Sequence, residues 1–218
     1  MNNLVIQEGN NEISMLTYIP NYLSSEKAKK IKDMLAKTEN WQGGTRNEGQ
    51  EIDRKQIWCQ MENKTFCKEW KKKHPRWESH EYNSSLLELQ QFIQKDCQKY
   101  LLDHQSIQKP KINSVLMNYY QTGEHFIPPH QDNKISFGSL PTIYLLSFGA
   151  TRQFSLERTH ESTLQRNNDQ SQLNKVFELQ DNSLFIMAGA VQKYFCHSLL
   201  KSQTKNSRYS LTFREYLQ

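Results

Sequence analysis

The stretch TIYLLSFGATRQFSL, residues 142–156, contains two short apolar runs that Gly149 divides. Short runs rich in β-branched and aromatic residues, bounded by glycine or proline, are typical of strands. The pattern recurs from about Lys111 onward and predicts strands at 114–120, 142–148, 152–156, 175–179, 184–187 and 209–213. Strands this short and this regularly spaced indicate a sandwich, jelly roll or barrel, with helices packed outside it.

The first half of the chain has a different pattern. After a strand-like run at 15–19, a helix is expected from Ser24 or Ser25 to about Lys37. A capping box that begins at Ser85 predicts a second helix to about residue 102.

Two polar stretches lie outside these elements. Residues 41–82, rich in glycine, asparagine and charge, are predicted as loops and short hairpins. Residues 157–174 are predicted as one long surface loop.

Length and composition fit one soluble domain. The 218 residues and 25.9 kDa suffice to bury roughly 70% of the unfolded surface. No apolar run approaches the ~18 residues of a membrane span, and the first residues lack the order of a signal peptide. The four cysteines form no C-x-x-C pair, so we expect reduced, structural cysteines and no zinc site. We therefore expect an intracellular protein without a membrane partner.

The charge distribution leaves two interpretations open. The net charge is +5, and the densest basic run, residues 68–77, interleaves lysine and arginine with Trp70 and Trp77. Such a run suits phosphate contacts and base stacking, but a solvated loop anchored by its tryptophans has the same composition.

A metal site is suggested by His130-Gln131-Asp132, because residues two apart in an extended chain point to the same face. His197 would complete the two-histidine, one-carboxylate triad that binds non-haem Fe(II) and leaves coordination positions open. Taken alone, His197 also fits a structural, hydrogen-bonded histidine.

The C-terminal run adds an anion site. Arg208, Ser210, Thr212 and Arg214 alternate with apolar residues and therefore share one face of the predicted strand. An inward-facing guanidinium needs an anion and suits a dicarboxylate. Iron with open positions beside an arginine-bound dicarboxylate implies 2-oxoglutarate as cosubstrate.

These motifs together resemble one known family. They are Asn118-Tyr119-Tyr120, His130-Gln131-Asp132, residues 147–154, His197-Ser198 and residues 208–214, and they occur in the order and spacing of the AlkB family of Fe(II)/2-oxoglutarate dioxygenases. Residues 53–56 and 112–118 resemble its eukaryotic nucleic-acid repair branch in particular. The resemblance extends from about Tyr18 to Glu215.

The resemblance implies a mainly β, α+β fold and one catalytic domain over residues 1–218. Residues 111–218 would form a double-stranded β-helix (jelly roll) core, and about 1–110 an N-terminal extension with a nucleotide-recognition lid. Carried over by position, the iron ligands are His130, Asp132 and His197; the 2-oxoglutarate residues are Asn118, Tyr120, Arg208, Ser210 and Arg214; and the substrate residues are Arg54, Gln56, Trp58, Phe66 and Asn133.

The implied activity is oxidative demethylation of alkylated bases in DNA or RNA, which releases formaldehyde, succinate and CO2. The expected partner is nucleic acid with methylated bases. We expect the protein to act as a monomer. Its expected location is the nucleus, with the cytoplasm as the alternative. The sequence leaves open whether the substrate is DNA or RNA, single or double stranded, and which base is methylated. Two other functions stay open: a non-catalytic AlkB-like subunit that binds nucleic acid or protein, and an oxygenase acting on a different substrate.

Three departures from the family pattern concern recognition. Ser210 replaces the usual asparagine, which shortens or removes one hydrogen bond to the cosubstrate. Asn133 and Lys134 replace acidic residues that approach the base, and residues 57–61 differ from the usual recognition loop. We therefore expect intact metal chemistry and a weaker preference for cationic methylated bases.

Overall fold

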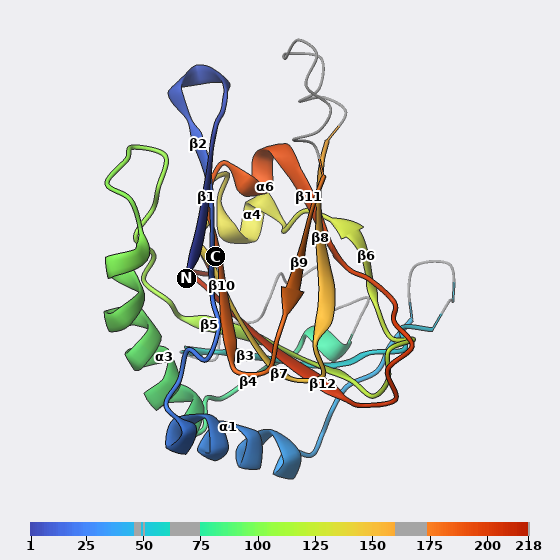
Figure 1. The fold of residues 1–218 in the computed structure, drawn as a ribbon. Helices are drawn as coiled ribbons and strands as arrows, with labels where there is room; N and C mark the ends of the chain where they lie inside the picture. The colour runs from blue at the N-terminus through green and yellow to red at the C-terminus, as the bar shows by residue number, and fades with distance from the viewer. Residues whose placement is uncertain (46–48, 50, 62–74, 160–173, 218) are drawn as a thin grey trace.

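The structure, a computed structural model, describes residues 1–45, 49, 51–61, 75–159 and 174–217. Its strands form two sheets (Figure 1). The eight-stranded sheet has the order β1 (Asn2–Gln7), β2 (Ile13–Ile19), β10 (Ser183–Gly189), β7 (Ile143–Gly149), β12 (Arg208–Arg214), β5 (Ser114–Tyr120), β3 (Lys55–Gln60) and β4 (Ser79–His80). The four-stranded sheet has the order β6 (Ile127–His130), β11 (Phe195–Leu199), β8 (Arg152–Arg158) and β9 (Asn174–Leu179). All neighbouring strands are antiparallel except β3 and β4.

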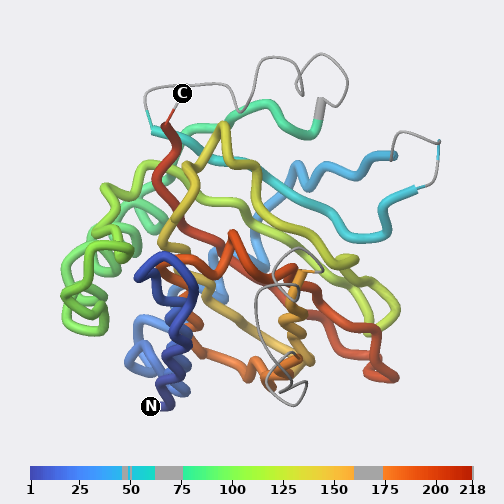
Figure 2. The backbone as a smooth tube through the Cα atoms, turned by 90° about the horizontal axis from the view of Figure 1, so that it is seen from above, coloured from blue at the N-terminus to red at the C-terminus, as the bar shows by residue number. Residues whose placement is uncertain are grey.

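Two long helices cover the outer face of the larger sheet. These are α1 (Ser25–Lys37) and α3 (Ser84–Asp96), and Figure 1 shows them on the side away from β8 and β6. Seen from above, both helices lie at the same edge of the molecule (Figure 2). Shorter helical turns are η1 (Gly9–Asn11), η3 (Pro75–Trp77), η4 (Cys97–Tyr100), α4 (Lys134–Phe137) and α6 (Val191–Tyr194).

The pleat of the central strands divides the core into two layers. On β7, Leu146 belongs to the apolar cluster that Ile31 and Ile93 of the helices join. Its neighbour Leu145 belongs to the cluster between the sheets, with Phe154. Successive side chains of a strand point to opposite faces, so one strand supplies both layers.

The strands predicted in the second half are confirmed within one or two residues of their ends, and so is the first helix. Ser24 caps α1, with its side chain accepting a hydrogen bond from the Lys27 backbone N–H. Three further strands, β1, β6 and β11, escaped prediction because they are short or lie at sheet edges.

Three sequence predictions need correction. Residues 41–82 are not only loops, since β3 pairs with β5 there; its buried Gln56 and Gln60 hide the apolar pattern of a strand. The second helix is capped by Asn83, whose side chain accepts from the Leu86 N–H, and not by a capping box at Ser85. It ends at Asp96 and continues only as a tighter turn to Tyr100.

The predicted loop at 157–174 lies mostly outside the described residues. In the part that is described, β8 continues to Arg158 and β9 begins at Asn174. In the described part of the chain, no helix is long and apolar enough to cross a membrane.

Gly189 is required where β10 ends and turns toward α6. Its φ is +69°, and a Cβ built there would lie 2.2 Å from the Ile13 carbonyl oxygen. Gly189→Ala is therefore predicted to lower the free energy of unfolding by more than about 1 kcal/mol, measured by urea denaturation. Gly43→Ala is the control, because no atom lies within 4 Å of its added Cβ. Equal stability of both variants would contradict this account of the turn.

Candidate active site

A cavity of about 260 Å³ lies between the two sheets. Its lining residues come from β5 and β12 on the larger sheet, from β6 and β11 on the smaller one, and from the N-terminal half. Among them are Asn118, Tyr120, His130, Asp132, His197, Arg208, Ser210 and Arg214. The cavity thus brings together all eight residues predicted for the metal and the cosubstrate.

Strand pairing brings the predicted metal ligands together. His130 ends β6 and lies opposite His197 of β11, and their ring centroids are 4.2 Å apart. Asp132 follows two residues after His130, and one ligand atom from each of the three side chains lies within 4.8 Å of the others. The sequence predicts these three residues as ligands, and the pairing of β6 with β11 shows how two histidines far apart in the chain meet.

The protonation states of the three residues suit a divalent cation. Burial lowers the pKa of His197 to about 3, with help from His130, so the imidazole is neutral. Burial also lowers the pKa of His130. Burial raises the pKa of Asp132, but Arg214, together with the two histidines in the protonated form they take at low pH, outweighs it, so the net pKa is lowered and the carboxylate is ionised.

Hydrogen bonding around the three residues leaves ligand atoms available. Nδ1 of His130 lies 3.0 Å from the Pro128 carbonyl oxygen, which only accepts, so the proton is on Nδ1 and Nε2 keeps its lone pair. Asp132 Oδ2 is buried without a hydrogen-bond partner, although Arg214 Nε lies 3.3 Å away. Two neutral imidazoles and one carboxylate are the donor set of non-haem Fe(II), so the residues fit that metal.

The buried, positively charged side chain of Arg208 forms another part of the cavity wall. Arg208 is 1% exposed, and its guanidinium donates a hydrogen bond to Ser147 Oγ at 2.8 Å. Burial lowers its pKa to about 10, so it stays charged at neutral pH. No carboxylate among the described residues pairs with it, and its Nε has no hydrogen-bond partner. A buried charge in this state calls for an anionic ligand.

Two residues predicted for the substrate line the cavity. Arg54 does so while its Nε donates to Asn118 Oδ1 at 3.2 Å, which links the N-terminal half to the predicted cosubstrate residues. Asn133 also lines the cavity, and its side chain caps α4 by accepting from the backbone N–H groups of Ile135 and Ser136.

Trp58 and Gln56 do not line the cavity, contrary to the prediction. The indole of Trp58 is fully buried against Phe137 and Tyr216, and its Nε1 donates to Gln60 Oε1 at 2.9 Å. Gln56 is 1% exposed. Both belong to β3, a strand that the sequence did not reveal, so they pack inside the sheet instead of reaching out from a loop.

Other aromatic and basic residues line the cavity where Trp58 and Gln56 were expected. Trp77, Arg76 and Ile52 line the cavity, and the first two end the basic run whose interleaved indoles already suggested a nucleic-acid surface. Phe66 and the lysines at 71–73 lie outside the described residues.

Sequence comparisons point to one superfamily. Residues 15–214 match the 2OG-Fe(II) oxygenase superfamily. Alpha-ketoglutarate-dependent dioxygenase alkB homolog 3 of Mus musculus is 36% identical over 104 residues, which are 47% of this chain and 36% of that protein. DNA oxidative demethylase ALKBH2 of Arabidopsis thaliana is 29% identical over 118 residues, 48% of this chain and 38% of that protein. The match therefore spans little more than a third of the length of these relatives.

Solved structures share the fold. An oxidoreductase of the 2OG-Fe(II) oxygenase family from Burkholderia pseudomallei superposes with a TM-score of 0.59 at 13% identity, over 91% of this chain and 84% of that one. OsALKBH1 superposes with a TM-score of 0.58 at 12% identity, over 98% of this chain and all of that one. The predicted double-stranded β-helix is thereby confirmed. With a sequence match over nearly its whole length and an intact His-Asp-His triad, the chain belongs to the 2OG-Fe(II) oxygenase superfamily, and its relatives are AlkB proteins.

Proposed function

We propose that this protein is an Fe(II)/2-oxoglutarate-dependent demethylase of alkylated nucleic-acid bases. The observation that carries the proposal is one cavity with a metal-ligand triad, a buried arginine that lacks a carboxylate partner among the described residues, and a wall from the N-terminal half. The name of the plant relative, DNA oxidative demethylase ALKBH2, supports the same substrate class.

In this proposal His130, Asp132 and His197 hold the iron. Iron with 2-oxoglutarate would supply oxygen activation: one oxygen atom of O2 would go to the methyl group, and the other would go to 2-oxoglutarate as it becomes succinate and CO2. The neutral imidazoles and the ionised carboxylate need not release a proton to solvent at neutral pH when they bind the cation, because their pKa values are already lowered.

Arg208 would bind the far carboxylate of 2-oxoglutarate, since its forked donors match a carboxylate. The ring of Tyr120 lies against it, with the guanidinium carbon 5.2 Å from the ring centroid. Arg214, beside Asp132, would act nearer the metal end. Ser210 Oγ accepts a 3.4 Å hydrogen bond from Asn118 Nδ2, so these two residues would orient the cosubstrate as a pair.

The base would enter along the wall that contains Trp77, Arg54 and Arg76. Trp77, 8% exposed, lines the cavity and would stack on the base, and the guanidinium groups of Arg54 and Arg76 line the same wall. Among the described residues of the cavity lining, Asp132 is the only carboxylate, and Arg214 lies beside it. A cationic methylated base would therefore meet like charge, and we expect neutral methylated bases to be preferred.

The metal site is tested by His130→Ala. The variant is predicted to lose Mn(II) binding measured by titration and to lose turnover, because two ligands hold the cation poorly. His80→Ala, on β4 outside the cavity lining, should bind Mn(II) as the parent does. Full metal binding by His130→Ala would show that the site is misassigned.

The cosubstrate site is tested by Arg208→Lys, which keeps the charge and loses the planar fork. One charge-assisted hydrogen bond contributes roughly 1.5 to 3 kcal/mol, so the dissociation constant of 2-oxoglutarate should rise about tenfold to a hundredfold. Calorimetric titration measures it. Arg158→Lys is a matched control, because Arg158 is also buried but pairs with Glu8 away from the cavity. Similar affinities in both variants would contradict the assignment.

The substrate wall is tested by Trp77→Leu. Stacking of a base on an aromatic contributes roughly 1 to 3 kcal/mol, so kcat/KM for a methylated oligonucleotide should fall by about tenfold. The affinity for 2-oxoglutarate should stay unchanged. Trp41→Leu is the control, since Trp41 packs on Tyr119 and Tyr209 and does not line the cavity. An unaltered kcat/KM in Trp77→Leu would remove this residue from the substrate site.

The activity itself is tested by anaerobic reconstitution with Fe(II) and 2-oxoglutarate, addition of oligonucleotides with single methylated bases, admission of oxygen, and mass spectrometry of the products. We expect loss of a methyl group and release of formaldehyde, with neutral methylated bases favoured over 1-methyladenine and 3-methylcytosine. Oxidation of 2-oxoglutarate with no change in any oligonucleotide would point instead to a different substrate class.

A further inference from the structure

Two glutamines join the chain segments that supply the candidate metal ligands. Gln131 lies between His130 and Asp132, whereas Gln192 lies in α6, five residues before His197. Each side chain reaches the backbone of the other segment, so the two contacts run in opposite directions.

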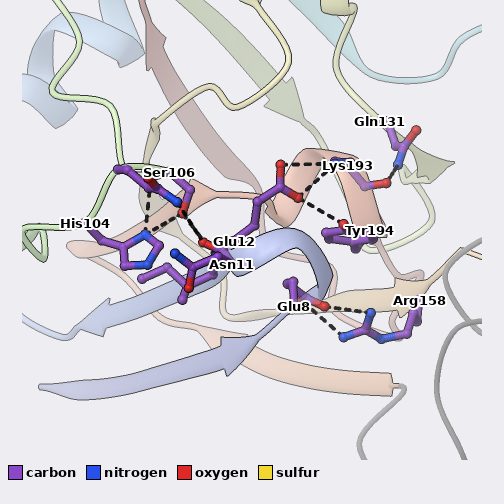
Figure 3. Close-up of polar contacts among 11 residues, drawn as sticks. Glu8, Asn11, Glu12, His104, Ser106, Gln131, Arg158, Lys193 and Tyr194 are labelled. Carbon is purple, nitrogen blue, oxygen red and sulfur yellow. Dashed lines mark hydrogen bonds and ion pairs between the residues drawn. The ribbon is translucent and has the colours of Figure 1, made fainter.

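Gln131 holds the segment that leads into β11. Its Nε2 donates to the carbonyl oxygens of Lys193 at 3.2 Å and Phe195 at 3.4 Å. Figure 3 shows this side chain directed at Lys193.

Gln192 contacts two of the candidate metal ligands, Asp132 and His197. Its Oε1 accepts from the Asp132 backbone N–H at 2.9 Å, and its Nε2 lies 3.4 Å from Nδ1 of His197. The residue is 1% exposed, so solvent does not compete for these contacts. The Asp132 N–H fixes the orientation of the amide, because a backbone N–H pairs only with the amide oxygen. The amide NH2 therefore faces Nδ1 of His197, which accepts from it in the metal-free protein. Once Nε2 of His197 binds a metal, Nδ1 carries the proton and this contact is no longer a hydrogen bond.

The short helix α6 is also fastened from its other side. Glu12, in the turn between β1 and β2, accepts from Lys193 Nζ at 2.8 and 3.0 Å and from the Tyr194 hydroxyl at 2.9 Å (Figure 3). The helix that presents Gln192 is therefore tied to the β1–β2 hairpin as well as to β6.

We propose that Gln192 is a positioning residue that sets the spacing between Asp132 and His197 for the metal. The proposal rests on the proposed role of His130, Asp132 and His197 as metal ligands. Replacing a residue that hydrogen-bonds to metal ligands without binding the metal itself typically lowers metal affinity about tenfold to a hundredfold. Sequence motifs do not reveal such a residue, because it acts on a backbone N–H and on a ring nitrogen contributed by two separate segments.

Two substitutions of Gln192 separate its polar contacts from its volume. Gln192→Met keeps the shape and loses the acceptor for the Asp132 N–H, so the Mn(II) dissociation constant is expected to rise about tenfold to a hundredfold. Gln192→Glu keeps an acceptor for the Asp132 N–H and presents a second acceptor to His197. An imidazole that binds a metal through one nitrogen has its proton on the other, so Gln192→Glu is expected to bind Mn(II) at least as tightly as the parent.

The experiment titrates Mn(II) into the metal-free full-length variants and follows the free ion by electron paramagnetic resonance. Gln90→Met is the matched control, because Gln90 is also buried but lies on α3, and its amide contacts Met61. We expect Gln90→Met to bind Mn(II) like the parent even if both methionine variants melt at a lower temperature.

Each contrary result has its own meaning. Three results would overturn the positioning role and leave the metal site in place. The first is Mn(II) binding by Gln192→Met as tight as in the parent, and the second is equal weakening in Gln90→Met. The third is a Gln192→Glu variant that binds Mn(II) as weakly as Gln192→Met. A parent protein that binds no Mn(II) would overturn the proposed metal site and this inference together.

Discussion

The burial of Arg208 without a carboxylate partner among the described residues is the constraint on which the site depends. Its strand, β12, runs through the larger sheet between β5 and β7, so the guanidinium has no path to solvent along the sheet edge. Burying an unpaired charge costs several kcal/mol, and the fold retains that cost at the cavity wall. A dicarboxylate that also reaches the metal ligands would offset it, which explains why a stable sheet would keep an arginine in this place.

The stability needed to support this charge comes from the opposite face of the same strands. Leu211 and Phe213 alternate with the cavity residues of β12 and pack into the cluster that α1 and α3 cover. Pairing of β6 with β11 then closes the smaller sheet over the cavity and sets His130 opposite His197. The apolar layer thus anchors the strands, and the inner face is free to hold polar groups whose pKa values are shifted by burial and by neighbouring charges.

The sequence predicts the chemistry of the site better than its shape. Period-two alternation in residues 208–214 correctly places Arg208 and Arg214 inside, because one face of a central strand must be buried. The substrate role expected for Trp58 comes from its position in the family pattern, and that pattern did not show β3, whose polar Gln56 and Gln60 conceal a strand. Nor does local sequence reveal that Trp77 reaches the cavity or that Gln192 contacts Asp132, because both contacts join segments far apart in the chain.

One cavity is proposed to hold the cosubstrate between the metal ligands and Arg208. The most direct measurement is calorimetric titration of 2-oxoglutarate into the parent protein with and without bound Mn(II), in the absence of oxygen-reactive iron. The account predicts one molecule bound per chain, much more tightly with Mn(II) than without it, because two separate groups then hold the two ends of the ligand. Equal affinity under both conditions, or no binding in either, would contradict it.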